Sequence, residues 1–125
     1  MIVIRECDKM KIVYKNKKVE RMCKDLSYAK REINQYSIKL HSLINLIENA
    51  ANLNDVARMG IYYLHPLEGK EKGKFALDIA GRKAGWRLII IPLNENEDKW
   101  DTTDVNIIYR STTAIIAWEV TNHYE

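Results

Sequence analysis

Two short apolar runs on either side of a glycine-bounded turn most constrain how this chain can fold. Residues 74–80 (KFALDIA) and 86–92 (WRLIIIP) are rich in apolar or β-branched side chains and are bounded by glycine or proline, a pattern typical of β-strands. The five residues between them begin and end with glycine, which adopts backbone angles that other residues avoid. We therefore predict a β-hairpin over residues 74–92.

Positive charge gathers around this predicted hairpin. Within residues 65–92, six cations stand against three acids, so the segment's net charge of +3 equals the formal net charge of the whole chain. The six cations are Lys70, Lys72, Lys74, Arg82, Lys83 and Arg87, and the acids are Glu68, Glu71 and Asp78. A local positive surface on a rigid sheet suits a polyanion such as RNA or DNA. The alternative is that these lysines are ordinary solvated surface residues.

The N-terminal third of the chain predicts a strand followed by a long helix. Ile12, Val13 and Tyr14 place a strand at residues 11–15, and residues 1–9 could add an accessory edge strand. From Asp25 or Ser27, either of which can cap a helix, apolar residues recur at spacings of three and four. This spacing predicts one amphipathic helix from about 28 to about 51, or the same helix broken near residues 34 and 35.

A second helix and another strand lead into the hairpin. Residues 55–59 predict a short helix that Gly60 ends in a left-handed cap. Residues 61–65 then predict a strand that stops at Pro66, because proline has no N–H to donate to a neighbouring strand. His65 is thereby placed at a strand end, beside the basic turn.

The C-terminal third predicts an acidic loop and a last strand. Residues 94–104 hold five acids and one lysine, so we expect this loop to lie away from a bound polyanion; the alternative is that it covers the basic site when that site is empty. Residues 112–120 predict a central or near-central strand, with Trp118 in the core. This strand brings Asn122, His123 and Tyr124 to its far end. The order of strand, helices and then strands predicts an α+β fold with helices on one face of an antiparallel sheet.

Composition predicts a single soluble domain. The chain of 125 residues with 46% hydrophobic content fits one domain, residues 1–125. Cys7 and Cys23 are too few for a disulfide framework, no leader pattern precedes them, and both are expected to be small packing residues. We therefore expect a cytoplasmic protein. The longest apolar run, residues 88–93, is far shorter than the ~20 residues that cross a bilayer, so no membrane span is expected.

Several segments of the sequence, taken in order, are similar to those of a known family. They are residues 65–73 (HPLEGKEKG), 77–79 (LDI), 86–92 (WRLIIIP), 115–124 (IIAWEVTNHY) and the opening 11–18 (KIVYKNKK). In this order and spacing they resemble the HigB branch of the RelE/ParE toxin superfamily. The resemblance implies a compact α+β domain with an N-terminal strand, a long and a short helix, and a curved antiparallel sheet.

The resemblance also implies a function. It indicates the toxin of a type II toxin–antitoxin system, a ribosome-dependent endoribonuclease that cleaves mRNA without a metal or other cofactor. The implied partners are mRNA, the ribosome and a HigA-like helix-turn-helix antitoxin, through which alone the complex would bind operator DNA. The alternatives are gyrase inhibition, as in ParE-like members, and an RNA-binding module without catalysis.

The C-terminus departs from the family pattern. Members commonly end in Asp-Tyr-His, whereas this chain has Asn122, His123 and Tyr124, and Glu68 replaces the lysine usual before Gly69. Neighbouring residues on a strand face opposite sides of the sheet. If the last strand continues to its end, Tyr124 rather than His123 occupies the position of the family's histidine. If the end frays, either side chain can reach that position.

Metal-free RNA cleavage requires a base for the 2′-OH, cations near the phosphorane and an acid for the leaving 5′ oxygen. His65, His123 and Tyr124 are the candidates for proton exchange, since histidine titrates near neutral pH. Arg87 is the candidate for binding the phosphate, because a guanidinium can form two parallel hydrogen bonds. The alternative is that Arg87 is an ordinary exposed arginine on a strand. The candidates for binding the RNA backbone are Lys70, Lys72, Lys74, Arg82 and Lys83.

Trp100 is unusual because it is a large aromatic residue in the acidic loop. Exposed aromatic side chains are enriched at protein interfaces, so Trp100 is a candidate contact for the antitoxin. The alternative is that the indole folds back over apolar surface.

Overall fold

A five-stranded sheet in the order β1-β5-β4-β3-β2 organises the computed structural model, which describes residues 9–124. The strands are β1 (Lys11–Tyr14), β2 (His65–Pro66), β3 (Phe75–Asp78), β4 (Trp86–Leu93) and β5 (Ala114–Asn122). β1 runs parallel to β5, and the other neighbouring strands are antiparallel. The last strand therefore lies inside the sheet, between β1 and β4, as predicted.

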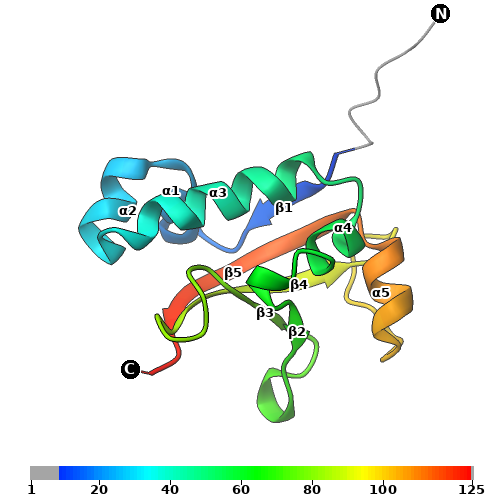
Figure 1. Ribbon diagram of the computed structural model, residues 1–125. Coiled ribbons are helices and arrows are strands. Elements are labelled where there is room, and N and C mark those ends of the chain that lie inside the picture. Colours follow the sequence, from blue (N-terminus) through cyan, green and yellow to red (C-terminus); the bar gives the residue numbers. More distant parts are fainter. Residues whose placement is uncertain (1–8, 125) are drawn as a thin grey trace, which may run out of the picture.

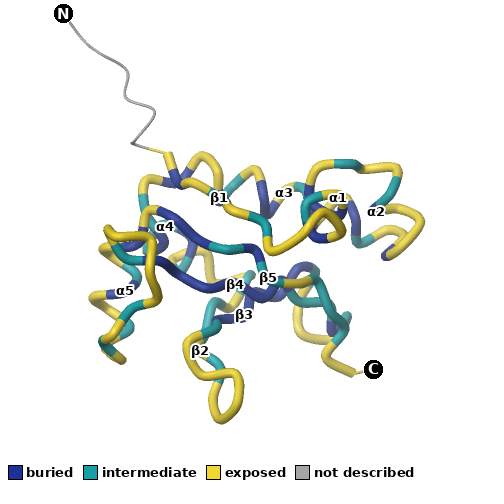
Figure 2. The backbone as a smooth tube through the Cα atoms, turned by 180° about the vertical axis from the view of Figure 1, so that it is seen from behind, coloured by how far each residue is buried: buried dark blue, intermediate teal, exposed yellow. Residues whose placement is uncertain are grey.

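Three helices cover one face of the sheet (Figure 1). They are α1 (Lys17–Lys24), α2 (Leu26–Ile33) and α3 (Tyr36–Asn49), while the shorter α4 (Leu53–Ala57) and α5 (Val105–Ser111) lie near one end. Leu40, Leu43 and Ile47 of α3 are fully buried in the same cluster as Leu88 and Ile90 of β4. The buried strands form the centre of the molecule, and the outer sides of the helices are exposed (Figure 2). The α+β prediction is confirmed, with one difference: the sheet is mixed and not wholly antiparallel, because β1 runs parallel to β5.

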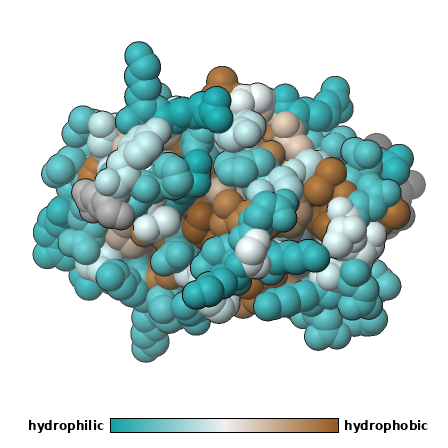
Figure 3. Space-filling view, turned by 90° about the horizontal axis from the view of Figure 1, so that it is seen from below, coloured by the Kyte–Doolittle hydropathy of each residue, from teal (hydrophilic) through white to brown (hydrophobic). Residues whose placement is uncertain are grey.

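The face opposite α1–α3, here called the second face, carries the alternate residues of each strand. Because Leu88 and Ile90 point into the core, Arg87, Ile89 and Ile91 point to the second face. Polar side chains surround apolar ones in the view from below (Figure 3). Trp118, which was predicted to lie in the core, is only partly buried and packs here against a small second core cluster that includes Ile91. A bulge in the pairing between β4 and β5 near Ile89 shifts the register at this point.

The predicted long helix is broken, in line with the second of its two alternatives. α2 ends at Ile33 and α3 begins at Tyr36, because Asn34 adopts a φ of 54° and interrupts the helical path. Two further helices, α1 and α5, lie where no helix was predicted. Each begins at a side-chain cap: Asn16 accepts from the Val19 N–H at 3.0 Å, and Asp104 accepts from the Asn106 N–H at 3.0 Å.

The segment before the hairpin differs most from its prediction. Residues Gly60–Tyr62 form a short 3₁₀ helix, η2, and β2 is only two residues long, so the predicted strand at 61–65 is wrong. The predicted left-handed cap at Gly60 is also wrong. That conformation falls on Tyr63, which ends η2 with φ 46° and ψ 56°.

The remaining expectations concern the N-terminus and the cysteines. Cys7 and nearly all of the predicted accessory strand at residues 1–9 lie outside the described residues. Cys23 is buried beside Val19 and Met22 in α1, and burial raises the pKa of its thiol to about 12. Its prediction as a packing residue is confirmed. No helix within residues 9–124 is both long and apolar enough to cross a membrane.

Candidate functional site

The predicted hairpin is present, and its turn end pairs an arginine with a buried carboxylate. β3 and β4 are antiparallel, and Asp78 lies directly opposite Arg87 on the second face. Arg87 Nε lies 3.5 Å from Asp78 Oδ1, with the aspartate side chain only 3% exposed. A carboxylate removed from water in this way needs a charged partner. Asp78 therefore restrains Arg87 at the surface of the sheet.

The C-terminal strand brings a histidine beside that arginine. β5 runs antiparallel to β4 up to Asn122, and the His123 N–H then donates to the Gly85 carbonyl at 2.8 Å. Arg87 Nη1 lies 3.3 Å from His123 Nδ1. A guanidinium can only donate, so Nδ1 accepts and a neutral His123 carries its proton on Nε2. A cation and an imidazole thus lie together at the sheet end.

Tyr124 turns back over the hairpin instead of extending the strand. Its hydroxyl donates to the Arg82 carbonyl at 3.0 Å, and its N–H donates to Asn122 Oδ1 at 2.9 Å. The ring lies on Gly85, where an added Cβ would come within 2.5 Å of Tyr124 Cδ2. β5 ends at Asn122, and His123 and Tyr124 both lie at this end of the sheet.

His65 reaches the same hairpin from the neighbouring strand. It pairs with Ala76 of β3, two residues from Asp78. Its ring stacks on Tyr63 with centroids 4.4 Å apart, and the guanidinium carbon of Arg82 lies 4.7 Å from the centroid of the same tyrosine ring. Tyr63 thus links His65 to the turn. The turn cluster, as we call it, consists of Tyr63, His65, Asp78, Arg82, Arg87, His123 and Tyr124.

The lysines before β3 lie elsewhere. Lys74 precedes β3 and is four residues from Asp78, a distance of about 13 Å along a strand. Its ammonium contacts Glu71 at 2.6 Å and lies 4.5 Å from the Trp118 ring centroid. Lys70 lies on the exposed 3₁₀ turn η3 (Gly69–Glu71), and Lys72 follows it directly. We call Lys70, Lys72 and Lys74 the loop lysines; Lys83 is exposed in the hairpin turn.

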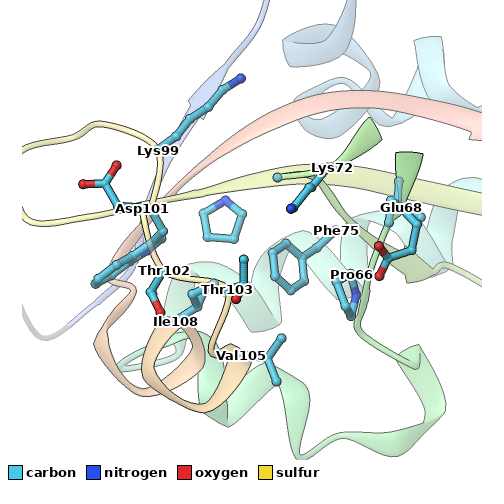
Figure 4. Close-up of a pocket in the computed structure, with 14 residues that line it drawn as sticks. Pro66, Glu68, Lys72, Phe75, Lys99, Asp101, Thr102, Thr103, Val105 and Ile108 are labelled. Carbon is cyan, nitrogen blue, oxygen red and sulfur yellow. The ribbon is translucent and has the colours of Figure 1, made fainter. Parts of the chain in front are cut away.

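A cavity of about 550 Å³ lies beside Lys72, one of the loop lysines (Figure 4). Lys72 and Phe75 line one side, and Asp101 of the acidic loop lines the other. The acidic loop therefore lies next to Lys72. Trp100 folds back there, and its indole N–H donates to Thr112 Oγ1 at 2.9 Å, so its fold-back alternative holds.

Two members of the turn cluster were not among the candidates from the sequence. Asp78 had a usable signal, because a single carboxylate inside an otherwise apolar strand is buried and needs a partner. Tyr63 had none, since its role depends on a left-handed backbone that the sequence does not mark. Within residues 9–124, no group of three or more His, Cys, Asp or Glu side chains is arranged to hold a metal ion.

Comparisons with known proteins add one finding. No family model and no curated protein sequence matches this chain. Among solved structures, the chain is similar to the YoeB/ParE toxin from Agrobacterium tumefaciens, with a TM-score of 0.52 and 16% sequence identity, over 92% of this chain and 100% of that one. The chain therefore has the same fold as that toxin.

Proposed function

We propose that this protein is the toxin of a type II toxin–antitoxin system and acts as a metal-free endoribonuclease on mRNA at the ribosome. The observation that carries the proposal is the turn cluster: Arg87, fixed by Asp78, lies 3.3 Å from His123. His65 and Tyr124 contact the same hairpin region through Tyr63 and the Arg82 carbonyl. The toxin-like fold of the chain supports the same function.

The proposed reaction is an attack of a 2′-OH on the neighbouring phosphate. His65 accepts the 2′-OH proton, the 2′ oxygen bonds to phosphorus, and the bond to the 5′ oxygen breaks as that oxygen takes a proton. Arg87 stabilises the charge on the phosphorane, which is a role for a fixed guanidinium. The leaving oxygen takes its proton from Tyr124, or from a His123 ring that is doubly protonated and has given up the contact between its Nδ1 and Arg87. The exposed cations Arg82, Lys83, Lys70 and Lys72, together with the half-buried Lys74, bind the RNA backbone.

The proposal includes a partner. A HigA-like helix-turn-helix antitoxin would neutralise the toxin in the cytoplasm and link it to operator DNA. The resemblance in sequence and the toxin-like fold support this partner. Co-expression with the adjacent reading frame tests it: a stable complex and relief of toxicity are expected.

The direct test of cleavage is a translation reaction with a defined message. Wild-type protein should cut the message in register with its codons. Arg87→Ala alone is a poor test because it leaves the Asp78 carboxylate buried and unpaired, at a cost of about 3–5 kcal/mol of folding stability. The paired change Asp78→Asn/Arg87→Gln removes both charges together. It should keep the fold and lower the cleavage rate by about 100-fold or more.

Controls separate the outcomes of this test. Arg110→Gln changes an exposed arginine of α5 and should leave cleavage unchanged. Loss of activity in both variants would point to general destabilisation. An intact message with folded wild-type protein would refute the nuclease proposal, and inhibition of gyrase supercoiling in its place would establish the ParE-like alternative.

A further inference from the structure

Tyr63 holds a backbone conformation that is rare for its residue type. Among residues 9–124, only Asn34, Tyr63 and Glu97 are non-glycine residues with positive φ, and a bulky aromatic residue is the least suited of the three to this region. Its side chain is 43% exposed, so burial of the ring does not explain the conformation. Such strain persists where surrounding contacts hold it, and it is common at functional sites.

The contacts of Tyr63 converge on His65. The Tyr63 carbonyl oxygen lies 2.8 Å from His65 Nδ1, two residues further along the chain. The two rings stack with centroids 4.4 Å apart and planes inclined by 27°. The guanidinium of Arg82 lies over the same tyrosine ring and adds a cation–π contact from the hairpin turn. One residue thus contacts the imidazole through both its backbone and its side chain.

The carbonyl contact determines where the imidazole carries its proton. A carbonyl oxygen only accepts, so His65 Nδ1 must be protonated to make this hydrogen bond. In the neutral ring, Nε2 is then the unprotonated nitrogen and can accept a proton. His123 has the opposite arrangement, because its Nδ1 accepts from Arg87.

We propose that Tyr63 is a positioning residue that fixes the tautomer and ring plane of His65, so that Nε2 is the free basic nitrogen. The role of His65 as general base rests on the proposed function, whereas its tautomer does not. The backbone on either side is already restrained. His65 pairs with Ala76, and Pro66 biases the residue before it towards extended backbone. The side-chain torsions of His65, which set the plane of its ring, are therefore the feature that Tyr63 fixes.

The test is nitrogen NMR of the imidazole rings in uniformly ¹⁵N-labelled full-length protein. Spectra are recorded at about pH 8, where an ordinary imidazole is neutral, and His65 is assigned with a His65→Gln variant. Wild-type protein should show His65 protonated on Nδ1. Tyr63→Gly tolerates the positive φ but removes the ring and frees the segment, so His65 should shift towards the Nε2–H tautomer. Tyr63→Phe keeps the stack and should restore the wild-type signal.

A neighbouring residue provides the matched control. Ile61→Gly also loosens η2, but the Ile61 side chain is 71% exposed and is not part of the stack. This variant should leave the His65 tautomer unchanged. A shift in Ile61→Gly equal to that in Tyr63→Gly would overturn the proposal, as would a wild-type His65 protonated on Nε2.

Cleavage assays on the same variants connect the tautomer to the reaction. Tyr63→Gly should lower the cleavage rate by about tenfold or more, and Tyr63→Phe should retain it. The NMR measurement of the tautomer and the cleavage assay can contradict the two proposals independently. An Nδ1–H tautomer that depends on Tyr63 in a protein without nuclease activity would refute the proposed function and leave the positioning role intact. Full cleavage by Tyr63→Gly with a shifted tautomer would refute the use of this positioning in catalysis.

Discussion

Arg87 has side-chain contacts on two sides, and these contacts distinguish it from the other cations of the hairpin. Asp78 fixes its Nε from β3, and His123 contacts its Nη1 from the end of β5. Its side chain is 20% exposed, so part of it remains accessible at the surface. A restrained arginine loses little freedom when it binds phosphate. Lys83 and Lys70, by contrast, are exposed, so a bound phosphate would have to order their side chains.

Tyr14 illustrates a buried polar group outside the site. Its hydroxyl is buried without a hydrogen-bond partner within residues 9–124. Burial, followed by the neighbouring Cys23, Glu48 and Glu20, raises the pKa of this phenol. The folded protein therefore keeps the phenol proton at a pH where the unfolded chain has lost it.

We expect Tyr14→Phe to raise the free energy of unfolding by about 1 kcal/mol at pH 7, because it removes the unpaired hydroxyl at constant shape. The variant should also lose less stability at alkaline pH. Above a pH of about 10 the unfolded chain binds fewer protons than the folded protein, so Tyr14 lowers stability as the pH rises. Urea unfolding at about pH 7 and pH 10.5 measures both effects. A destabilised variant at pH 7 would show that the hydroxyl is satisfied in solution.

At the scale of elements, the hairpin and β5 followed from the sequence because their apolar runs are long and clearly bounded. α1 did not, since its buried residues Val19, Met22 and Cys23 lie among lysines and give too short a pattern. α5 has only one fully buried residue, Ile108, and its start is set by the Asp104 cap. Residues 61–65 look like a strand in composition, but the turn at Tyr63 leaves only β2.

Part of the candidate site could be predicted from the sequence, because the predicted strands bring distant residues together. Antiparallel pairing of β4 and β5 was enough to bring Arg87 and His123 to one end of the sheet. The predicted single group of six cations does not form, because Lys74 and Arg87 lie at opposite ends of the β3–β4 pairing. A count of charges along the sequence takes no account of the distance between residues at the two ends of a strand.

The turn of the hairpin offers a matched pair of glycine substitutions. Gly81 and Gly85 both have positive φ, at 84° and 78°, so alanine at either position should cost about 1 kcal/mol of folding stability. Only at Gly85 would the new Cβ also meet Tyr124, 2.5 Å from its Cδ2. We expect Gly85→Ala to be the more destabilising variant in urea unfolding and to displace the Tyr124 ring. The cleavage rate should fall more in Gly85→Ala than in Gly81→Ala; equal losses would show that the position of Tyr124 does not matter.

At the scale of the whole molecule, the six cations of residues 65–92 form two groups at opposite ends of the β3–β4 pairing. Arg82, Lys83 and Arg87 lie at the turn, and the loop lysines lie about 13 Å away along β3. Between them the second face carries Ile89, Ile91 and Trp118, with Lys15 also over the tryptophan ring at 3.9 Å. The helices cover the other face. A single RNA strand that reaches from one cationic group to the other therefore has to cross the second face.

Salt-dependent binding of an uncleavable 2′-O-methyl RNA distinguishes this path from binding at the turn alone. Each lysine that contacts a phosphate contributes about 0.7 to the slope of log K against log salt for a single strand. We expect Lys83→Gln and Lys72→Gln each to reduce the slope by about that amount, and the double variant to reduce it by the sum, because the two groups bind separate phosphates. Lys39→Gln, on the exposed side of α3, should leave the slope unchanged. A normal slope for Lys72→Gln would confine the RNA to the turn cluster and leave the cavity beside Lys72 outside its path.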